Sequence, residues 1–155
     1  MAQERNFPMT IFLAEDDEDD SILFLEVVRE LHPDITVKVS QDGQQLLDDL
    51  RRSQMEQPEI LFLDINMPLK NGFECLKEIK DSGIYRGMKI IMFSTSSSTM
   101  HIEISYKLGA DFYAVKPGSF QHLKEMLAGI LAIDWKAALR NKKNFLLVAK
   151  KMNVL

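Results

Sequence analysis

The sequence predicts a single doubly wound α/β domain, in which helices cover both faces of a parallel β-sheet. Two features of the chain support this prediction. Five short apolar segments with the character of buried strands alternate with segments whose apolar residues follow helical spacing. The length of 155 residues and the hydrophobic content of 46% suit one ordinary globular core and are too small for two.

Each predicted strand is a short apolar run that stops at a polar residue, as strands buried inside a parallel sheet do. We expect strands at residues 9–14, 35–40, 60–63, 89–93 and 111–115. The third strand is apolar throughout and stops at Asp64, after which Pro68 and Gly72 indicate a loop. This pattern places a carboxylate at the carboxyl end of a strand, where ligands bind in open α/β sheets.

Segments with helical spacing connect these strands. We expect helices over residues 21–31, 43–55, 72–81, 102–108 and 119–133. Asp19 or Asp20 is the expected N-cap of the first helix, because acids favour the positive end of the helix dipole. Segment 102–108 also alternates as a strand would. Gly109 suits a helix end, however, so we predict a helix with a poorly defined apolar face.

The composition excludes several classes of protein. The net charge of −4 argues against a general nucleic-acid binder. No apolar run approaches the length of a membrane span, and the N-terminus lacks the apolar region of a secretory signal. The lone Cys75 excludes an internal disulfide, and its helical context predicts a small buried hydrophobe. We therefore expect a cytoplasmic protein with no nucleic-acid or membrane partner.

Polar side chains follow four of the predicted strands and should meet at one edge of the sheet. They are Glu15, Asp16, Asp64, Ser94 and Lys116. Gathered carboxylates repel one another unless a cation lies among them, and hard oxygen ligands with open water positions suit Mg²⁺. A lysine and a hydroxyl are the partners that a phosphoryl group needs, and an aspartate can carry that group as a nucleophile.

Each of these residues also has a purely structural interpretation. Asp64 can cap its strand, Lys116 can form a strand-end salt bridge, and Ser94 can be an ordinary turn hydroxyl. Residues 17–20 can be the solvated start of a helix. The chain contains no glycine-rich phosphate loop, which disfavours a nucleotide as phosphoryl donor. The acidic run 15–20 lacks the central glycine of a calcium-binding EF-hand loop.

The polar strand ends together resemble the signature of a response-regulator receiver domain, the chemotaxis-regulator-like fold. The matching residues are Glu15-Asp16, Asp64 with Asn66-Met67-Pro68 and Gly72, Ser94-Thr95, Tyr113 and Lys116-Pro117. The resemblance covers about residues 8–133 and implies a flavodoxin-like (βα)5 sandwich with a five-stranded parallel sheet of order 2-1-3-4-5. Residues 94–117 are also similar to stand-alone regulators that serve bacterial phytochrome-type histidine kinases.

The resemblance implies a phosphoacceptor and a metal site. Asp64 is expected to accept a phosphoryl group from a phosphohistidine on a sensor kinase or phosphotransfer protein. Asp16 and Asp64 are expected to ligate Mg²⁺ directly, together with the backbone carbonyl of Asn66. Glu15 is expected to act mainly through water.

The resemblance also implies a switch. Lys116 and Ser94 are expected to contact the phosphoryl oxygens, and Tyr113 to turn inward as Ser94 moves toward the phosphate. The face formed by residues 99–117 would change for partner binding or dimerisation. Ser94 stands where threonine is commoner in the family, and the Lys116-Pro117 bond is cis in the family.

Residues 134–155 are expected to form a basic and apolar C-terminal extension, too short for an output domain. The extension holds six basic residues and one acid, a balance of +5, which leaves −9 on the rest of the chain. The last helix is expected to run on to about Arg140. The apolar run 144–149 can pack on its own domain as an extra strand or helix, form a homodimer contact, or pair with the sheet edge of a partner.

The sequence therefore predicts a single-domain two-component response regulator, a phosphorylation-driven switch and not a turnover enzyme. The alternative is a phosphohydrolase that forms an aspartyl phosphate at Asp64. That chemistry would want a second acid two residues on to protonate the leaving group, and Asn66 cannot do this. A scaffold without phosphorylation is the third reading, which the complete set of acid, hydroxyl and lysine disfavours.

Overall fold

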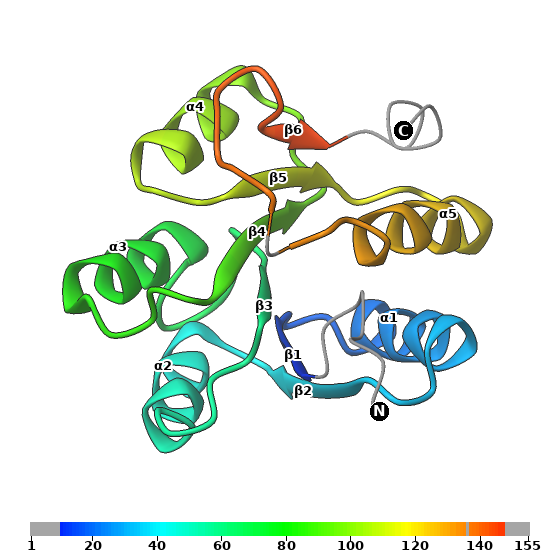
Figure 1. Ribbon diagram of the computed structural model, residues 1–155, viewed down its shortest axis with the longest axis horizontal. Helices are drawn as coiled ribbons and strands as arrows, with labels where there is room; N and C mark the ends of the chain where they lie inside the picture. Colours follow the sequence, from blue (N-terminus) through cyan, green and yellow to red (C-terminus); the bar gives the residue numbers. More distant parts are fainter. Residues whose placement is uncertain (1–9, 136, 148–155) are drawn as a thin grey trace.

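The computed structural model describes residues 10–135 and 137–147, which form helices on both faces of one parallel sheet (Figure 1). The strands are β1 (Thr10–Ala14), β2 (Thr36–Ser40), β3 (Ile60–Leu63), β4 (Lys89–Ser94), β5 (Phe112–Val115) and β6 (Leu146–Leu147). The helices are α1 (Glu18–Leu31), α2 (Gly43–Arg52), α3 (Gly72–Ser82), α4 (Thr99–Lys107) and α5 (Phe120–Leu131). Helices α1 and α5 cover one face of the sheet, and α2, α3 and α4 cover the other. The predicted flavodoxin-like α/β fold is confirmed.

The alternation of side chains along the strands builds two separate apolar cores. Under α1 and α5, the rings of Phe24, Phe62 and Phe93 meet edge to face, with centroids 5.0 to 6.0 Å apart. On the other face, Leu61 and Leu63 are buried against α2 and α3. Strand β3 is thus buried on both faces, as its unbroken apolar run predicted.

The caps of the helices come from residues that the strand-end loops supply. Asn71 forms a capping box with Glu74 at the start of α3. Helix α1 begins earlier than predicted, and the prediction of Asp19 or Asp20 as its N-cap is wrong. Asp17 is the cap, because its carboxylate accepts a hydrogen bond from the Asp20 amide at 3.0 Å.

The sheet has six strands in the order β2-β1-β3-β4-β5-β6, so the predicted five-stranded sheet is incomplete. The additional strand β6 pairs in parallel with β5 and comes from the apolar run in the C-terminal extension. The packing of this run on its own domain, one of three options left open by the sequence, is therefore what the structure shows. Val148 and Ala149 of that run, like Met9 of the first predicted strand, lie outside the described residues.

Helix α5 ends at Leu131, and the prediction that it continues to about Arg140 is wrong. Trp135 turns back, so that its indole N–H donates to the carbonyl of Ile130 at 3.1 Å and its ring meets Phe112 edge to face. This packing competes with helix continuation and directs the chain toward the edge of β5.

The structure also bears on the predictions for α4, for Cys75 and for the Lys116-Pro117 bond. Helix α4 is confirmed, and Ser105 is its one buried residue, which agrees with a weakly packed apolar face. Cys75 is fully buried, and burial raises the pKa of its thiol to about 12, so it behaves as a small hydrophobe.

The described residues contain no cis peptide bond, so the bond between Lys116 and Pro117 is trans, unlike the family's cis bond. No helix in the described part of the chain is long and apolar enough to cross a membrane.

Candidate functional site

Three carboxylates lie together at the carboxyl ends of β1 and β3. Oxygen atoms of Glu15, Asp16 and Asp64 all lie within 4.8 Å of one another. The sheet itself sets this proximity, because the backbone amide of Asp64 donates to the carbonyl of Ala14 at 3.1 Å. The sequence prediction that these strand ends converge is therefore confirmed for the acids.

Both oxygens of the Asp64 carboxylate have partners. Oδ1 accepts a hydrogen bond from the Ile65 amide at 2.8 Å, and Oδ2 accepts one from Lys116 Nζ at 3.1 Å. The residue is 7% exposed, so the carboxylate is held in one orientation at the edge of the solvent. A Cβ on Gly72 would lie 2.1 Å from the Asp64 carbonyl oxygen, so this glycine permits a backbone contact that positions the acid.

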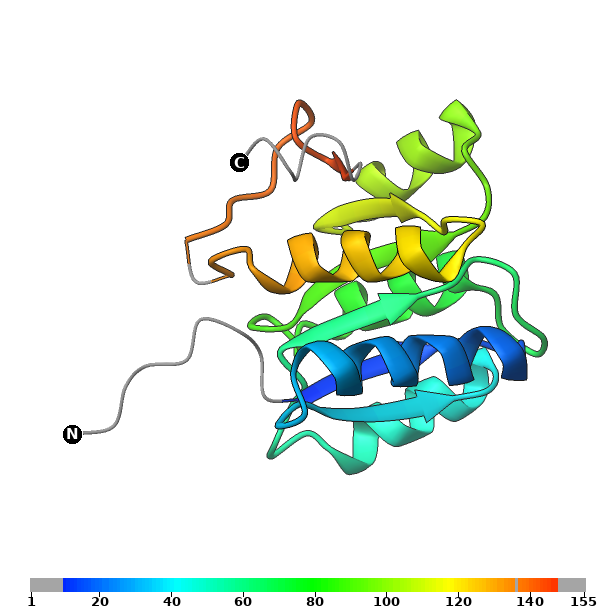
Figure 2. The same cartoon turned by 90° about the vertical axis from the view of Figure 1, so that its right-hand side faces the viewer.

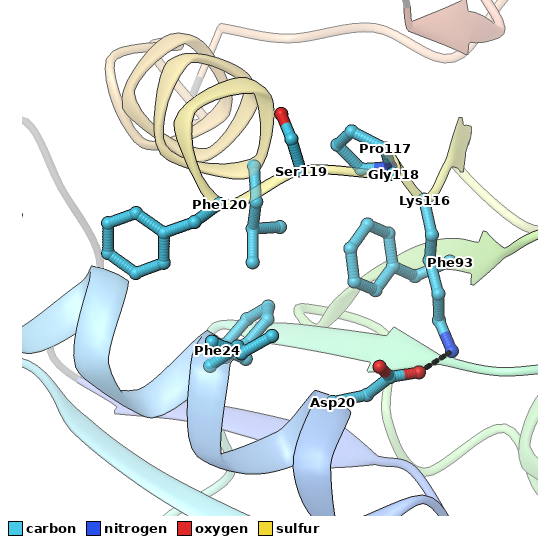
Figure 3. A pocket seen from close by; sticks show the side chains of 10 residues that line it. Asp20, Phe24, Phe93, Lys116, Pro117, Gly118, Ser119 and Phe120 are labelled. Carbon is cyan, nitrogen blue, oxygen red and sulfur yellow. Dashed lines mark ion pairs between the residues drawn. The ribbon is translucent and has the colours of Figure 1, made fainter.

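Lys116 is the cation of the site. Its Nζ forms ion pairs with Glu15 and Asp64 and lies 3.6 Å from a carboxylate oxygen of Asp20, the contact drawn in Figure 3. Burial favours a lower pKa for Lys116. The hydrogen bond to Glu15 and the charge of Asp64 outweigh burial, however, so the pKa lies above its usual range. Lys116 therefore stays protonated and positively charged next to Asp64, the candidate nucleophile.

Glu15 is the most perturbed acid of the group. Its side chain is 3% exposed, and this burial raises its pKa to about 7 even though the hydrogen bond and charge of Lys116 lower it. Its second oxygen accepts from the amide of Asp17 at 3.2 Å. A carboxylate with this pKa is easily neutralised by a proton or by a cation at neutral pH.

The structure does not expose Ser94 beside the three acids. Ser94 is fully buried, and its hydroxyl accepts a hydrogen bond from the Ser96 amide at 3.1 Å. Tyr113 is also fully buried and donates its hydroxyl to the Ser96 carbonyl at 2.7 Å. Burial is the largest influence on the Tyr113 hydroxyl and raises its pKa. The predicted switch pair is thus joined through Ser96.

Comparison with known proteins agrees with this geometry. The family model of the response regulator receiver domain matches residues 11–128. The chain is a receiver domain. It is 30% identical over 134 residues to response regulator Rcp1 of the cyanobacterium Synechocystis, a match that covers 84% of this chain and 91% of Rcp1. A receiver domain is a phosphorylation-dependent switch of two-component signalling, which is a more specific role than the phosphoryl chemistry that the strand-end residues indicate.

Solved structures of similar regulators have the same fold. The phosphorylated cyanobacterial phytochrome response regulator RcpA aligns with a TM-score of 0.75 and 29% identity, covering 84% of this chain and 96% of RcpA. The Mn²⁺-bound form of Rcp1 aligns with a TM-score of 0.73 and 27% identity, covering 86% of this chain and 99% of Rcp1. The resemblance to phytochrome response regulators inferred from residues 94–117 is confirmed as a similarity.

The acidic hollow of this receiver domain suits a divalent cation. Among the described residues its wall contains seven acids, one lysine, one asparagine and one threonine: Glu15, Asp16, Asp17, Glu18, Asp19, Asp20, Asp64, Lys116, Asn66 and Thr95. Carboxylate oxygens at this separation repel one another, and a hard cation with water ligands relieves that repulsion. The exposed Asn66 lies beside the acids, where the sequence placed it in the ligand set.

The sequence assigned no functional role to two residues at the mouth of the site. Thr95 lines the acidic hollow where Ser94 does not, so a hydroxyl is present one residue later than expected. Asp20 contacts Lys116, although residues 17–20 had a plain interpretation as a solvated helix start. The signal for Asp20 was its place in the acidic run that follows the first strand, because the first turn of α1 begins at the same edge of the sheet.

A second, smaller hollow of about 130 Å³ adjoins the acidic one (Figure 3). It lies between the first turns of α1 and the loop from β5 to α5, and the two hollows share Asp20 and Lys116. The rings of Phe24, Phe93 and Phe120 supply much of its wall. The opening above the candidate nucleophile therefore has an acidic side and an apolar side.

Proposed function

We propose that Asp64 is the phosphoacceptor of this receiver domain and that a phosphohistidine of a sensor kinase or phosphotransfer protein is its donor. The observation that carries the proposal is the hydrogen bond of 3.1 Å from Lys116 Nζ to Asp64 Oδ2, at a strand end that Glu15 and Asp16 also reach. A buried carboxylate beside one firm cation is suited to become a mixed anhydride, because the lysine can follow the negative charge onto the phosphoryl group.

In the transfer step, a carboxylate oxygen of Asp64 forms a bond to phosphorus while the phosphorus–nitrogen bond of the phosphohistidine breaks. The imidazole leaves with the electron pair and takes up a proton. The Ile65 amide holds the Asp64 carboxylate in place, and Lys116 neutralises charge on the oxygens of the phosphoryl group.

Mg²⁺ is the cation that we propose for the acidic hollow. Glu15, Asp16 and Asp64 would hold it with their carboxylates and Asn66 with its backbone carbonyl, and Glu15 would act mainly through water. When bound, Mg²⁺ neutralises negative charge on the carboxylates and on the incoming phosphoryl group. Asp16 is exposed and Glu15 is buried, which supports the direct role of the first and the indirect role of the second.

The phosphorylated domain would act as a switch and not as a turnover enzyme. Ser94 and Tyr113 would respond to the phosphoryl group, and the face of residues 99–117 would change for partner binding or for a homodimer. The similarity to RcpA and Rcp1 supports a phytochrome-type kinase as the donor. We also propose that the receiver domain spans residues 8–133, that residues 134–155 are an extension, and that the protein is cytoplasmic.

The test is incubation of the purified chain with Mg²⁺ and acetyl phosphate, followed by intact-mass spectrometry. One labile phosphoryl group is expected on the wild type and none on Asp64→Asn. Steady hydrolysis of phosphate esters would instead support the phosphohydrolase alternative, and no reaction of either kind would support a scaffold. Phosphotransfer from a panel of histidine kinases would then identify the donor.

A further inference from the structure

The segment that follows α5 is attached to the domain by specific contacts. It leaves the end of α5, crosses the side of the sheet and returns to the edge of β5 as β6 (Figures 1 and 2). Along this path, Lys89 Nζ donates to the carbonyl of Ala138 at 3.4 Å, and the Trp135 ring packs on Phe112. The segment is therefore part of the folded domain.

Phe145 connects this segment to Tyr113. Its carbonyl accepts a hydrogen bond from the Tyr113 amide at 2.9 Å. Phe145 is 3% exposed, and the centroid of its ring lies 5.1 Å from that of Tyr106 and 6.5 Å from that of Tyr113. Phe145 thus touches both the backbone and the ring of the tyrosine proposed as the switch.

Arg140 attaches the segment to α4 and to the turn between α4 and β5. Its Nε donates to the carbonyl of Ala110 at 2.7 Å, and its second guanidinium nitrogen donates to the carbonyl of Tyr106. The guanidinium carbon also lies 3.8 Å from the centroid of the Tyr106 ring. This planar, two-point contact covers the same aromatic ring that Phe145 meets.

The opposite side of Tyr113 leads to the phosphoacceptor. The tyrosine hydroxyl donates to the Ser96 carbonyl, and the Ser96 amide donates to the Ser94 hydroxyl. The backbone amide of Lys116 donates to the Ser94 carbonyl at 2.8 Å, and the side chain of Lys116 holds Asp64. A short chain of contacts therefore links Asp64 to Phe145 through the buried Tyr113.

We propose that residues 140–147 are a built-in effector of the phosphorylation switch. Docking of this segment stabilises the buried position of Tyr113, because the ring of Phe145 lies against the Tyr113 ring and is itself held by the ring of Tyr106. The proposal rests on the proposed function, in which the inward position of Tyr113 belongs to the phosphorylated state. Linkage then requires a reciprocal effect: the docked segment favours phosphorylation of Asp64, and phosphorylation tightens the docking by the same factor.

The first experiment uses the unaltered protein. Amide hydrogen exchange is measured by NMR with Mg²⁺ alone and with Mg²⁺ plus beryllofluoride, a phosphoryl mimic. We expect the Tyr113 and Leu147 amides to slow at least fivefold more than the amides of β2, which lies at the opposite edge of the sheet. Equal slowing at the two edges would overturn the proposal, because it would report general stabilisation.

The second experiment measures beryllofluoride affinity in the presence of Mg²⁺. Phe145→Ala is expected to weaken binding about tenfold, and Arg140→Lys, which keeps the charge but loses the two-point contact, about threefold. Leu139→Ala is the matched control, because Leu139 directly precedes the segment and is 79% exposed. Circular dichroism establishes that each variant is folded. If Phe145→Ala does not fold, Arg140→Lys and the exchange experiment decide.

The outcomes separate this proposal from the proposed function. Absence of beryllofluoride binding by the wild type would contradict the function of Asp64. Binding by the wild type that Phe145→Ala and Arg140→Lys leave unchanged would contradict the role of the segment alone.

Discussion

Removal of Lys116 is the sharpest test of the electrostatic balance at the site. The side chains of Lys116 and Asp64 are each 10% exposed and that of Glu15 is 3% exposed, so the ion pairs between them are largely removed from solvent. Loss of one partner from a buried ion pair costs about 3–5 kcal/mol, because it leaves unpaired charge in a poorly solvated place. We expect Lys116→Ala to lower the free energy of unfolding by about 3 kcal/mol at pH 8.

We expect a cost at the lower end of this range of about 3–5 kcal/mol because Glu15 can lose its charge by taking up a proton. Its pKa is already raised to about 7 by burial, and loss of the lysine removes the contacts that oppose this rise. Glu15 in the variant is therefore expected to take up a proton near neutral pH, which limits the loss of stability.

The assay is urea denaturation in EDTA, followed by circular dichroism and compared with Lys124→Ala. Lys124 pairs with Glu30 at 2.6 Å on the surface between α1 and α5, where such a pair contributes about 0.2–1 kcal/mol. Saturating Mg²⁺ should reduce the deficit of Lys116→Ala, since the cation replaces the missing positive charge. If Lys116→Ala costs no more than Lys124→Ala, the reasoning about a buried charge balance is refuted.

Two further predictions concern the backbone and the pH dependence of the same site. Gly72→Ala should destabilise the protein by about 1–3 kcal/mol and slow phosphorylation by acetyl phosphate, because the new Cβ would meet the Asp64 carbonyl oxygen at 2.1 Å. Gly87→Ala, with no heavy atom within 4 Å of its Cβ, is the control in thermal melts, and equal melting temperatures would contradict the clash. Glu15 has its pKa raised from 4.5 to about 7, so the folded state binds its proton more tightly than the unfolded state. Without metal, the contribution of Glu15 to stability is therefore fully present below pH 4.5 and is lost as the pH rises through 7. The free energy of unfolding of the wild type, relative to that of Glu15→Gln, should fall across this pH range. A difference in denaturation midpoint that stays constant with pH would disprove the assignment.

Most of the fold could be predicted because its main signals are local. The apolar run Ile60–Leu63 has no polar face, so it could be stable only inside a sheet covered on both sides, and the structure buries every residue of it. Once β1 and β3 are parallel neighbours, Glu15 and Asp64 at their carboxyl ends must lie close together. The convergence of the acids therefore followed from the order of strands and polar residues in the chain.

The limits of helices and the fate of the extension depended on competition between contacts distant in sequence. Residues 132–140 are compatible with further helix, but the contact of Trp135 with Phe112 outweighs that local preference. Leu146 and Leu147 could have paired with any open strand edge, and β5 in the same chain offers one with a high effective concentration.

The same distinction holds for the site. Residue types and strand ends were sufficient to predict that the acids and Lys116 lie together with hydroxyl groups nearby, because the sequence gives both the chemistry of each side chain and its position at the end of a strand. The choice of Thr95 over Ser94 at the mouth of the hollow, and of Asp20 as a partner of Lys116, depended on how loops and side chains pack. Those contacts join elements that are far apart in the chain, so they are decided by the folded whole.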